Sequence, residues 1–290
     1  MLGCVIPLHD DNPTTHPPIL TIAFIVVNVL VFLWQIQGGE VANAQKTLHY
    51  AAIPHNVAGR GEAGFRFVAE RTQQGDVTIV GIDRRSFADA TTAREHGYDT
   101  QPIAPWITLF TSMFMHGGWM HLIGNMWFLW IFGNNVEDAL GRTKFLAFYL
   151  LTGLVASGLH VVMTPSDPSR PPIEQMDLIP TLGASGALSG ALGAYLILYP
   201  RARVLTLVPL GYFLTTIELP AVFFLGLWFL MQIVGVLGAG AGVAWYAHIG
   251  GFAAGLLLGK LLETAEHRSR PRGRRGAPAW AHRPRRTVRW

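Results

Sequence analysis

Three polar motifs stand inside or beside strongly apolar stretches of this sequence, and together they contain the groups that acyl transfer requires. Ser185 stands in the motif G-A-S-G, and His248 lies in a later apolar stretch. His116, His121 and Asn125 lie in the motif H-G-G-W-M-H-L-I-G-N. These residue types are a nucleophile, a base and hydrogen-bond donors for a developing negative charge. Polar groups within apolar spans are costly, so they are functional candidates.

Ser185 is expected in the first turn of its helix. Unpaired N–H groups and a partial positive charge at a helix N-terminus favour an oxyanion formed when the serine attacks a carbonyl. Gly183 and Gly186 on either side would let a substrate backbone approach closely. Taken alone the motif is a weak signal, because Ser and Gly are also common helix-packing residues in membranes.

Small residues recur at every fourth position in two apolar stretches, Gly186, Gly190 and Ala194 in one and Gly251, Gly255 and Gly259 in the other. Such ridges let two helix backbones pack closely. Ser185 lies beside the first ridge and His248 lies three residues before the second, so docking them predicts contact between hydroxyl and imidazole. A Ser–His pair is the minimal activated nucleophile. No span offers an evident Asp or Glu to orient the histidine, so we expect a dyad.

His121 and Asn125 are four residues apart and therefore share one face of a helix. Both side chains can donate hydrogen bonds, so the pair could hold an anion near one end of a buried helix. The alternative is that both bond to neighbouring helices and only join them. Together with Ser185 and His248, the pair favours the anion site.

The composition is that of a membrane protein. Of 290 residues only 14% are charged and 50% are hydrophobic, against about 25% charged in an average soluble domain. Disorder of the bulk is excluded because the chain is rich in aromatic residues and poor in charge, and a collagen-like repeat because glycine has no period of three. A disulfide scaffold is excluded because Cys4 is the only cysteine. The net charge of +4 belongs to the tail, where residues 264–290 carry nine arginines against one acid.

A bilayer core of about 30 Å needs about 20 mostly apolar residues as a helix. Six stretches fit, namely Ile19–Gln37, Trp119–Gly133, Phe145–Met163, Leu182–Tyr199, Ala221–Leu237 and Val243–Leu262. We predict an all-α membrane protein, a six-helix transmembrane bundle over residues 19–263. Residues 1–18 form an N-terminal segment, and residues 264–290 form a basic, disordered tail.

The distribution of Lys and Arg predicts the orientation. Fourteen lie in loops and tail on one side and one, Arg170, lies in the short loops opposite. Both termini are therefore expected in the cytoplasm, with the protein in the plasma (inner) membrane and the long first loop outside. The arginines of the tail are expected to rest against anionic lipid headgroups. No nucleic-acid partner is expected.

Several segments outside the spans have their own predictions. Residues 60–100 are a small extramembrane insertion with a strand-like stretch at 77–80. Pro102–Phe114 is too short to span and is expected in the interface, and Arg201–Ile217 is a similar surface-lying approach to the fifth span. The glycine- and alanine-rich loop 238–242 is hypothesised to be a mobile cap that gates substrate entry.

With these motifs in order, the chain strongly resembles the rhomboid intramembrane serine proteases. The motifs are H-G-G-W-M-H-L-I-G-N at 116–125, G-N-N-V-E-D-A-L-G at 133–141, G-A-S-G at 183–186 and A-H-I-G-G-F-A-A-G at 247–255. The resemblance covers about 102–262 and the first span. It implies a six-span protease that cleaves transmembrane helices of other proteins, without cofactor or metal.

The resemblance also implies residue roles. Ser185 would be the nucleophile and His248 the general base, and His121 and Asn125 would form the oxyanion hole with the Ser185 backbone N–H. Other residues would support the site, namely His116, Gly183, Gly186, Glu137 and Gly251. Of these, Glu137 would hold the adjoining loop by polar contacts.

The chain departs from frequent family residues at two positions. Ile107 follows Trp106 where many members have arginine, and Ser189 stands where many have an aromatic residue stacked on the catalytic histidine. Trp245 or Tyr246 could brace His248 instead.

Three other functions are compatible with parts of the pattern. A proteolytically inactive rhomboid-like binding protein would keep the fold but lose the serine or the histidine, and both are present. A metalloprotease could use His116, His121 and His248 as zinc ligands, but the chain has no H-E-x-x-H. A transporter would also carry polar residues in broken helices, yet inverted repeats are not visible.

Overall fold

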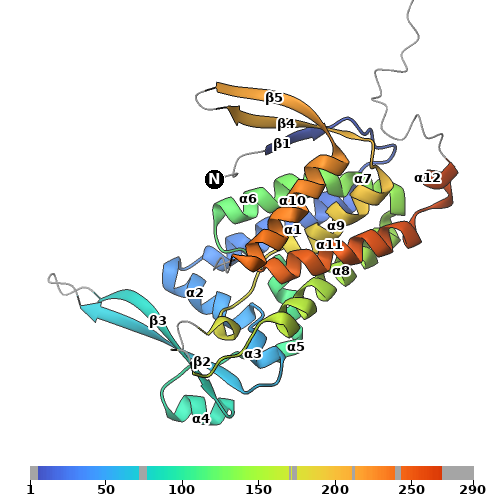
Figure 1. Ribbon diagram of the computed structural model, residues 1–290. Coiled ribbons are helices and arrows are strands. Elements are labelled where there is room, and N and C mark those ends of the chain that lie inside the picture. Colours follow the sequence, from blue (N-terminus) through green and yellow to red (C-terminus); the bar gives the residue numbers. More distant parts are fainter. Residues whose placement is uncertain are drawn as a thin grey trace, which may run out of the picture.

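The structure is a computed structural model that describes residues 6–71, 77–169, 171, 175–210, 213–238 and 243–269, with backbone alone at 69–71, 77–80, 210, 213 and 266. A bundle of helices forms the body of the molecule, with a hairpin projecting at one end and a small sheet at the other (Figure 1). The predictions for Cys4, for Arg170, for residues 239–242 and for the tail from 270 onward lie outside the described residues.

Each of the six stretches predicted as spans is helical over most of its length. The bundle comprises α1 (Ile19–Ile36), α6 (Trp119–Phe128), η2 (Leu129–Gly133), α7 (Asn134–Leu140), α8 (Arg142–Met163), α9 (Ser185–Leu198), α10 (Ala221–Leu237) and α11 (Trp245–Leu262). The second predicted span is α6 continued by the π-helical turn η2. Two of the helices described, α1 and α8, are long and apolar enough to cross a membrane, and α9 and α10 are apolar but shorter.

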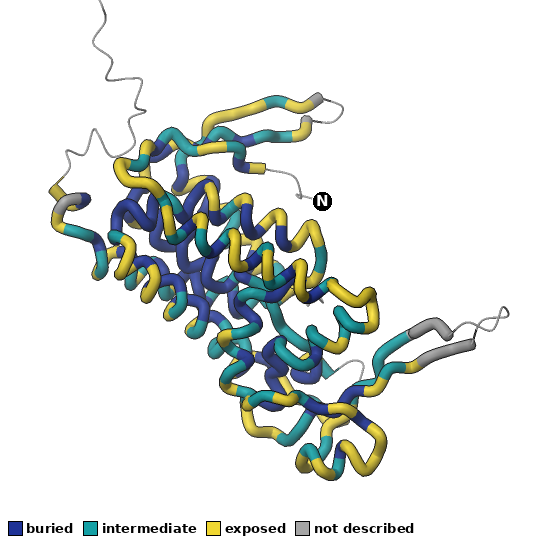
Figure 2. Tube along the Cα trace, turned by 180° about the vertical axis from the view of Figure 1, so that it is seen from behind, coloured by how far each residue is buried: buried dark blue, intermediate teal, exposed yellow. Residues whose placement is uncertain are grey.

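The bundle is apolar both inside and on much of its outer surface. Its interior is a continuous buried core (Figure 2) with many aromatic residues, among them Phe132, Phe145, Phe148, Tyr149 and Tyr195. Large apolar side chains are also exposed on the outer faces of α1 and α10, including Ile22, Leu30, Leu33, Phe223, Leu230 and Leu237. An exposed apolar surface of this extent is typical of a lipid-facing protein.

Helices α9 and α11 pack with their backbones in close contact, as the spacing of small residues predicts. A Cβ atom added to Gly251 would lie 2.1 Å from the carbonyl oxygen of Gly186, and one added to Gly255 would lie 1.9 Å from that of Gly190. Both distances are too short for any side chain. The two ridges therefore fix the register of α11 on α9.

The sheet differs from the expectation for residues 201–217, which predicted only a surface-lying approach to the fifth span. Strand β4 (Arg203–Leu210) pairs antiparallel with both β5 (Phe213–Pro220) and β1 (Ile6–Asp10). Val204 and Thr206 on alternate positions of β4 are buried, which is the two-residue period of a strand with one covered face. The N-terminal segment supplies the third strand.

The first loop is largely ordered. It contains α2 (Gly39–Tyr50), α3 (Pro54–Val57), β2 (Glu62–Arg71), β3 (Val77–Phe87), α4 (Ala90–Glu95), α5 (Pro105–Thr111) and η1 (Ser112–Phe114). Strands β2 and β3 form an antiparallel hairpin, so the predicted strand at 77–80 is confirmed.

The first loop also forms hydrogen bonds with the segment between α8 and α9. This segment passes through η4 (Met176–Leu178). Ala52 and Thr181 exchange two backbone hydrogen bonds of 3.0 and 2.7 Å. The backbone N–H of Gly183 donates to the carbonyl of Ser112 at 2.8 Å. The start of α9 is therefore positioned from both sides. A short helix, α12 (Ala265–Ser269), ends the described chain, so the prediction of disorder from residue 264 onward is wrong for these first residues of the tail.

Candidate active site

The structure brings the hydroxyl of Ser185 and the imidazole of His248 into hydrogen-bond contact. Ser185 is the first residue of α9, and His248 lies in the first turn of α11. Because these helices pack in a fixed register, Oγ of Ser185 lies 2.9 Å from Nε2 of His248. Both residues line a cavity. The contact allows a proton to move from the hydroxyl to the imidazole.

A third residue, absent from the sequence prediction, orients the imidazole. Nδ1 of His248 lies 2.8 Å from Oε1 of Gln232 on α10. The amide of Gln232 is itself fixed, because its Nε2 donates to the carbonyl of Trp228 at 2.8 Å. Its oxygen must therefore face His248 and accept the Nδ1 proton, which leaves Nε2 free to accept from Ser185. The sequence does contain a signal for this residue, because Gln232 is a polar side chain in an otherwise apolar helix and such residues are functional candidates.

Aromatic rings flank His248 on two sides. The ring of Trp228 lies 5.9 Å from it at an interplanar angle of 37°, and the ring of Trp245 lies 6.3 Å away at 86°. Tyr246, the other residue expected there, contacts His160 instead, at 6.5 Å. Ser189, at the position of the frequent aromatic residue, donates from Oγ to the carbonyl of Ser185 at 2.6 Å.

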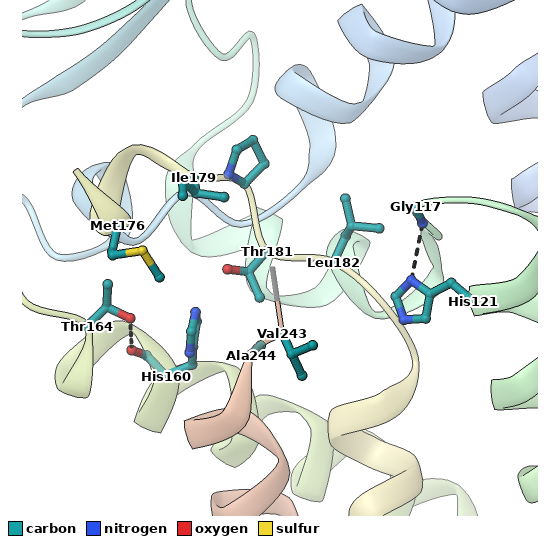
Figure 3. A pocket seen from close by; sticks show the side chains of 11 residues that line it. Gly117, His121, His160, Thr164, Met176, Ile179, Thr181, Leu182, Val243 and Ala244 are labelled. Atoms are coloured by element: carbon teal, nitrogen blue, oxygen red, sulfur yellow. Dashed lines mark hydrogen bonds between the residues drawn. The ribbon is translucent and has the colours of Figure 1, made fainter. Parts of the chain in front are cut away.

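His121 and Asn125 on α6 face the same cavity as Ser185. The backbone N–H of Gly117 donates to Nδ1 of His121 at 3.3 Å (Figure 3), so the proton of the neutral ring lies on Nε2. Nδ2 of Asn125 is buried and has no hydrogen-bond partner among the described residues. Both groups are thus available to donate to a ligand.

Gly183 leaves the space between His121 and Ser185 open. Its φ of +128° is a conformation that favours glycine. A Cβ atom there would lie 2.9 Å from Nε2 of His121 and 3.6 Å from Oγ of Ser185. A side chain at this position would therefore occupy the place where an oxyanion would meet its donor.

The cavity that holds Ser185 and His248 has a volume of about 580 Å³, and Trp228 and Phe128 form part of its apolar wall. A second pocket of about 250 Å³ adjoins it, because Gly117, His121, Leu182, Val243 and Ala244 line both. Figure 3 shows this pocket between the loop that precedes α9, the end of α8 and the start of α11. A polypeptide lying across both could reach Ser185.

His116 lies behind His121 and is fully buried. Its backbone N–H donates to Oε1 of Gln35 at 3.1 Å, and its carbonyl accepts from Nε2 of Gln35 at 2.9 Å. Its ring lies 5.2 Å from that of His121, and neither ring nitrogen has a partner among the described residues. Burial, and to a lesser extent His121, lowers the pKa of His116 to about 4, so at neutral pH its ring adds no charge to the site.

Glu137 on α7 contacts the start of α1. Its carboxylate accepts from the backbone N–H groups of Leu20 and Thr21 at 3.0 and 2.8 Å and from the Thr21 hydroxyl at 2.8 Å. These N–H groups belong to the first turn of α1, so the carboxylate caps that helix and complements its dipole.

A second chain of serine, histidine and aspartate joins the first loop to the segment that leads to α9. Oγ of Ser86 on β3 is 2.8 Å from Nε2 of His55, and Nδ1 of His55 is 3.1 Å from Oδ2 of Asp177. The guanidinium of Arg60 pairs with the same carboxylate at 3.3 Å. Because Arg60 shares Asp177, this group acts as a tie between the first loop and the segment leading to Ser185.

Comparisons with known proteins place the chain among rhomboids. The family model described as "Rhomboid domain" matches residues 104–264. Rhomboid protein 1, mitochondrial, of Saccharomyces cerevisiae is 30% identical over 60% of this chain and 47% of its own length. Rhomboid protease GluP of Bacillus subtilis is 32% identical over 53% of this chain and 26% of its own. RHOMBOID-like protein 4 of Arabidopsis thaliana is 33% identical, over 60% and 39% respectively. The chain thus spans less than half the length of these relatives.

Proposed function

Because this chain belongs to the rhomboid family of multi-pass membrane proteins, we propose that it is an intramembrane serine endopeptidase. Its substrates are transmembrane segments of other membrane proteins. The observation that carries this proposal is the contact of 2.9 Å between Oγ of Ser185 and Nε2 of His248 within a helical bundle.

The reaction begins with proton transfer from Ser185 to His248. As Oγ attacks the substrate carbonyl carbon, Nε2 takes the hydroxyl proton, and the carbonyl oxygen becomes an oxyanion. Gln232 keeps the proton on Nδ1 and stabilises the imidazolium that forms. The imidazolium then protonates the leaving amine, the C–N bond breaks and an acyl-enzyme remains. Water repeats the sequence, with His248 as base, and releases Ser185.

The oxyanion is stabilised by donors already in place. Nε2–H of His121 lies beside the space that Gly183 leaves open, and Asn125 and the start of α9 line the same cavity, so their N–H groups are the further donors in this proposal. Donors fixed before the reaction do not reorganise as charge develops, and in a site away from bulk water they act strongly. His116 supports the ring of His121 from behind.

The bundle spans the bilayer six times in this proposal, through α1, α6 with η2, α8, α9, α10 and α11. Both termini are cytoplasmic, in the plasma membrane, and the first loop is outside. Ser185 opens α9 at the end of the bundle nearest the first loop, so the site lies toward the outer leaflet. The basic tail contacts anionic headgroups, and the domain extends over 19–263.

Cleavage of a single-span reporter tests this function. The reporter carries Ala and Gly near its outer end and is mixed in liposomes with the purified wild type, Ser185→Ala or His248→Ala, with and without a chelator. Cleavage by the wild type alone, unaffected by chelator, is expected. Cleavage that survives in both variants would contradict the mechanism. Absence of cleavage by all three favours the second candidate, an inactive rhomboid-like binding protein.

A further inference from the structure

The pocket of about 250 Å³ beside the catalytic cavity is placed to receive a substrate side chain. It shares His121 and Leu182 with the cavity of Ser185, and the loop that precedes α9 forms one of its walls. A polypeptide whose scissile carbonyl lies at Ser185 can therefore place a nearby side chain in this pocket. The residues that line the pocket then select that side chain.

His160, near the end of α8, is the histidine of this pocket that the proposed mechanism does not use. Figure 3 shows its ring at one end of the pocket and that of His121 at the other, with Thr181 between them. Its Nδ1 is buried and has no hydrogen-bond partner among the described residues. A buried polar atom without a partner is unfavourable. A ligand group that bonds to His160 would remove that penalty.

The other groups that line the pocket are compatible with a ligand group that is negatively charged and accepts hydrogen bonds. The described lining includes two histidines and two threonines, Thr164 and Thr181, but no aspartate or glutamate. The Thr164 hydroxyl is already used, because it donates to the His160 carbonyl at 2.6 Å. Just behind Thr164, the guanidinium of Arg60 donates to its carbonyl at 3.3 Å, and its charge is balanced by the ion pair with Asp177.

We propose that this pocket binds an acidic side chain, Asp or Glu, of the substrate near the scissile bond, with His160 donating to the carboxylate. The inference rests on the proposed function and adds a substrate class to it. A carboxylate only accepts hydrogen bonds, and bonds to an ionised acceptor are about twice as strong as neutral ones. An aliphatic side chain of the same size would leave Nδ1 of His160 unpaired. The outer end of the bundle also allows the charge of the substrate to stay close to the headgroups and water.

A set of reporters with one varied residue tests this inference. Starting from the Ala/Gly reporter, Glu, Gln or Leu is placed singly at each position from about four residues before to about three after the cleaved bond. At one position the wild type is expected to cleave the Glu reporter with a kcat/KM about 10-fold above that of the Leu reporter, the size of one charged hydrogen bond. The Gln reporter is expected to lie between them.

The same ratio is then measured in variants. His160→Leu is expected to bring the Glu-to-Leu ratio to about one, and His160→Gln, which keeps a donor, to retain part of it. His96→Leu, the same change at an exposed histidine of the first loop, is the matched control and should keep the ratio. A loss of folding lowers both reporters equally and leaves the ratio intact.

Two results would overturn the inference while leaving the protease intact. One is cleavage of the parent reporter with no preference for Glu at any position. The other is a Glu preference unchanged in His160→Leu. A wild type that cleaves no reporter, the parent included, contradicts the proposed function itself, and this inference falls with it.

Discussion

Oε1 of Gln232 accepts a hydrogen bond from Nδ1 of His248 at 2.8 Å, so a side chain of α10 orients the base carried by α11. The orienting group is a neutral amide instead of a carboxylate. Inside an apolar bundle this is favourable, since a buried carboxylate would be far more costly to desolvate. The amide also links α10 to the Ser185–His248 pair.

Replacement of Gln232 by Leu is expected to lower kcat by about 10- to 100-fold with little change in KM, because an unoriented imidazole samples the wrong tautomer and rotamer. Gln232→Glu keeps an acceptor and is expected to retain more activity than Leu, with a changed pH profile of kcat. Gln37→Leu, at an exposed glutamine, is the control. Equal kcat in Gln232→Leu and wild type would remove Gln232 from the mechanism.

The two proposed oxyanion donors should act on the rate more than on binding. His121→Ala and Asn125→Ala are each expected to reduce kcat by about 100- to 1,000-fold, as removal of one such donor does elsewhere. KM should stay nearly constant, since these donors bond most strongly to the transition state. Steady-state kinetics on the reporter measure both constants. A rise in KM with unchanged kcat would show that these residues bind substrate only.

The contact between α9 and α11 should be intolerant of any side chain. Gly255→Ala places a methyl group 1.9 Å from the carbonyl oxygen of Gly190, so the helices must separate at a cost of about 1–3 kcal/mol. Thermal unfolding in detergent is expected to show a lower Tm, and activity should fall because Ser185 and His248 move apart. Gly226→Ala on α10 is the control, since a Cβ atom there meets nothing within 4 Å. Equal Tm values in both variants would contradict this packing.

Asp10 should make stability depend on pH. Its Oδ2 accepts from the Tyr195 hydroxyl at 2.6 Å and from Nδ2 of Asn135 at 2.8 Å. Burial raises its pKa from 3.8 to about 7, although these hydrogen bonds oppose the shift. The folded protein therefore keeps a proton that the unfolded chain has released, and stability falls as the pH rises from about 4 to about 7.

Asp10→Asn removes this titration. As the pH rises from about 5 to about 8, the Tm of the wild type is expected to fall relative to the Tm of the variant. His116, whose lowered pKa makes stability fall toward acid pH, contributes equally to both proteins and cancels in the comparison. Parallel Tm curves for the two proteins would contradict the role of Asp10.

The sequence predicts the helices and the contact between α9 and α11 well, because both depend on local patterns. Apolar length marks a helix, and a four-residue spacing such as Gly186 to Gly190 marks the face that packs. The same pattern indicated which face of α11 carries His248.

The sheet and the orienting amide could not be predicted in this way. Strand β4 pairs with β1 about 200 residues earlier in the chain, and the strand period of Val204 and Thr206 is hidden in a generally apolar segment. Gln232 was missed because its partner depends on how α10 is rotated against α11, which no spacing within either helix reveals. The tie of His55 to Asp177 joins segments that are equally remote in sequence.

The most direct test of the central claim is covalent labelling of the purified protein with a fluorophosphonate, followed by mass-spectrometric mapping of the adduct. The reagent reacts with serines activated by a neighbouring base. We predict an adduct on Ser185 in the wild type and its loss in His248→Ala. No adduct on Ser185, undiminished labelling of Ser185 in His248→Ala, or an adduct on Ser86 alone would contradict the account.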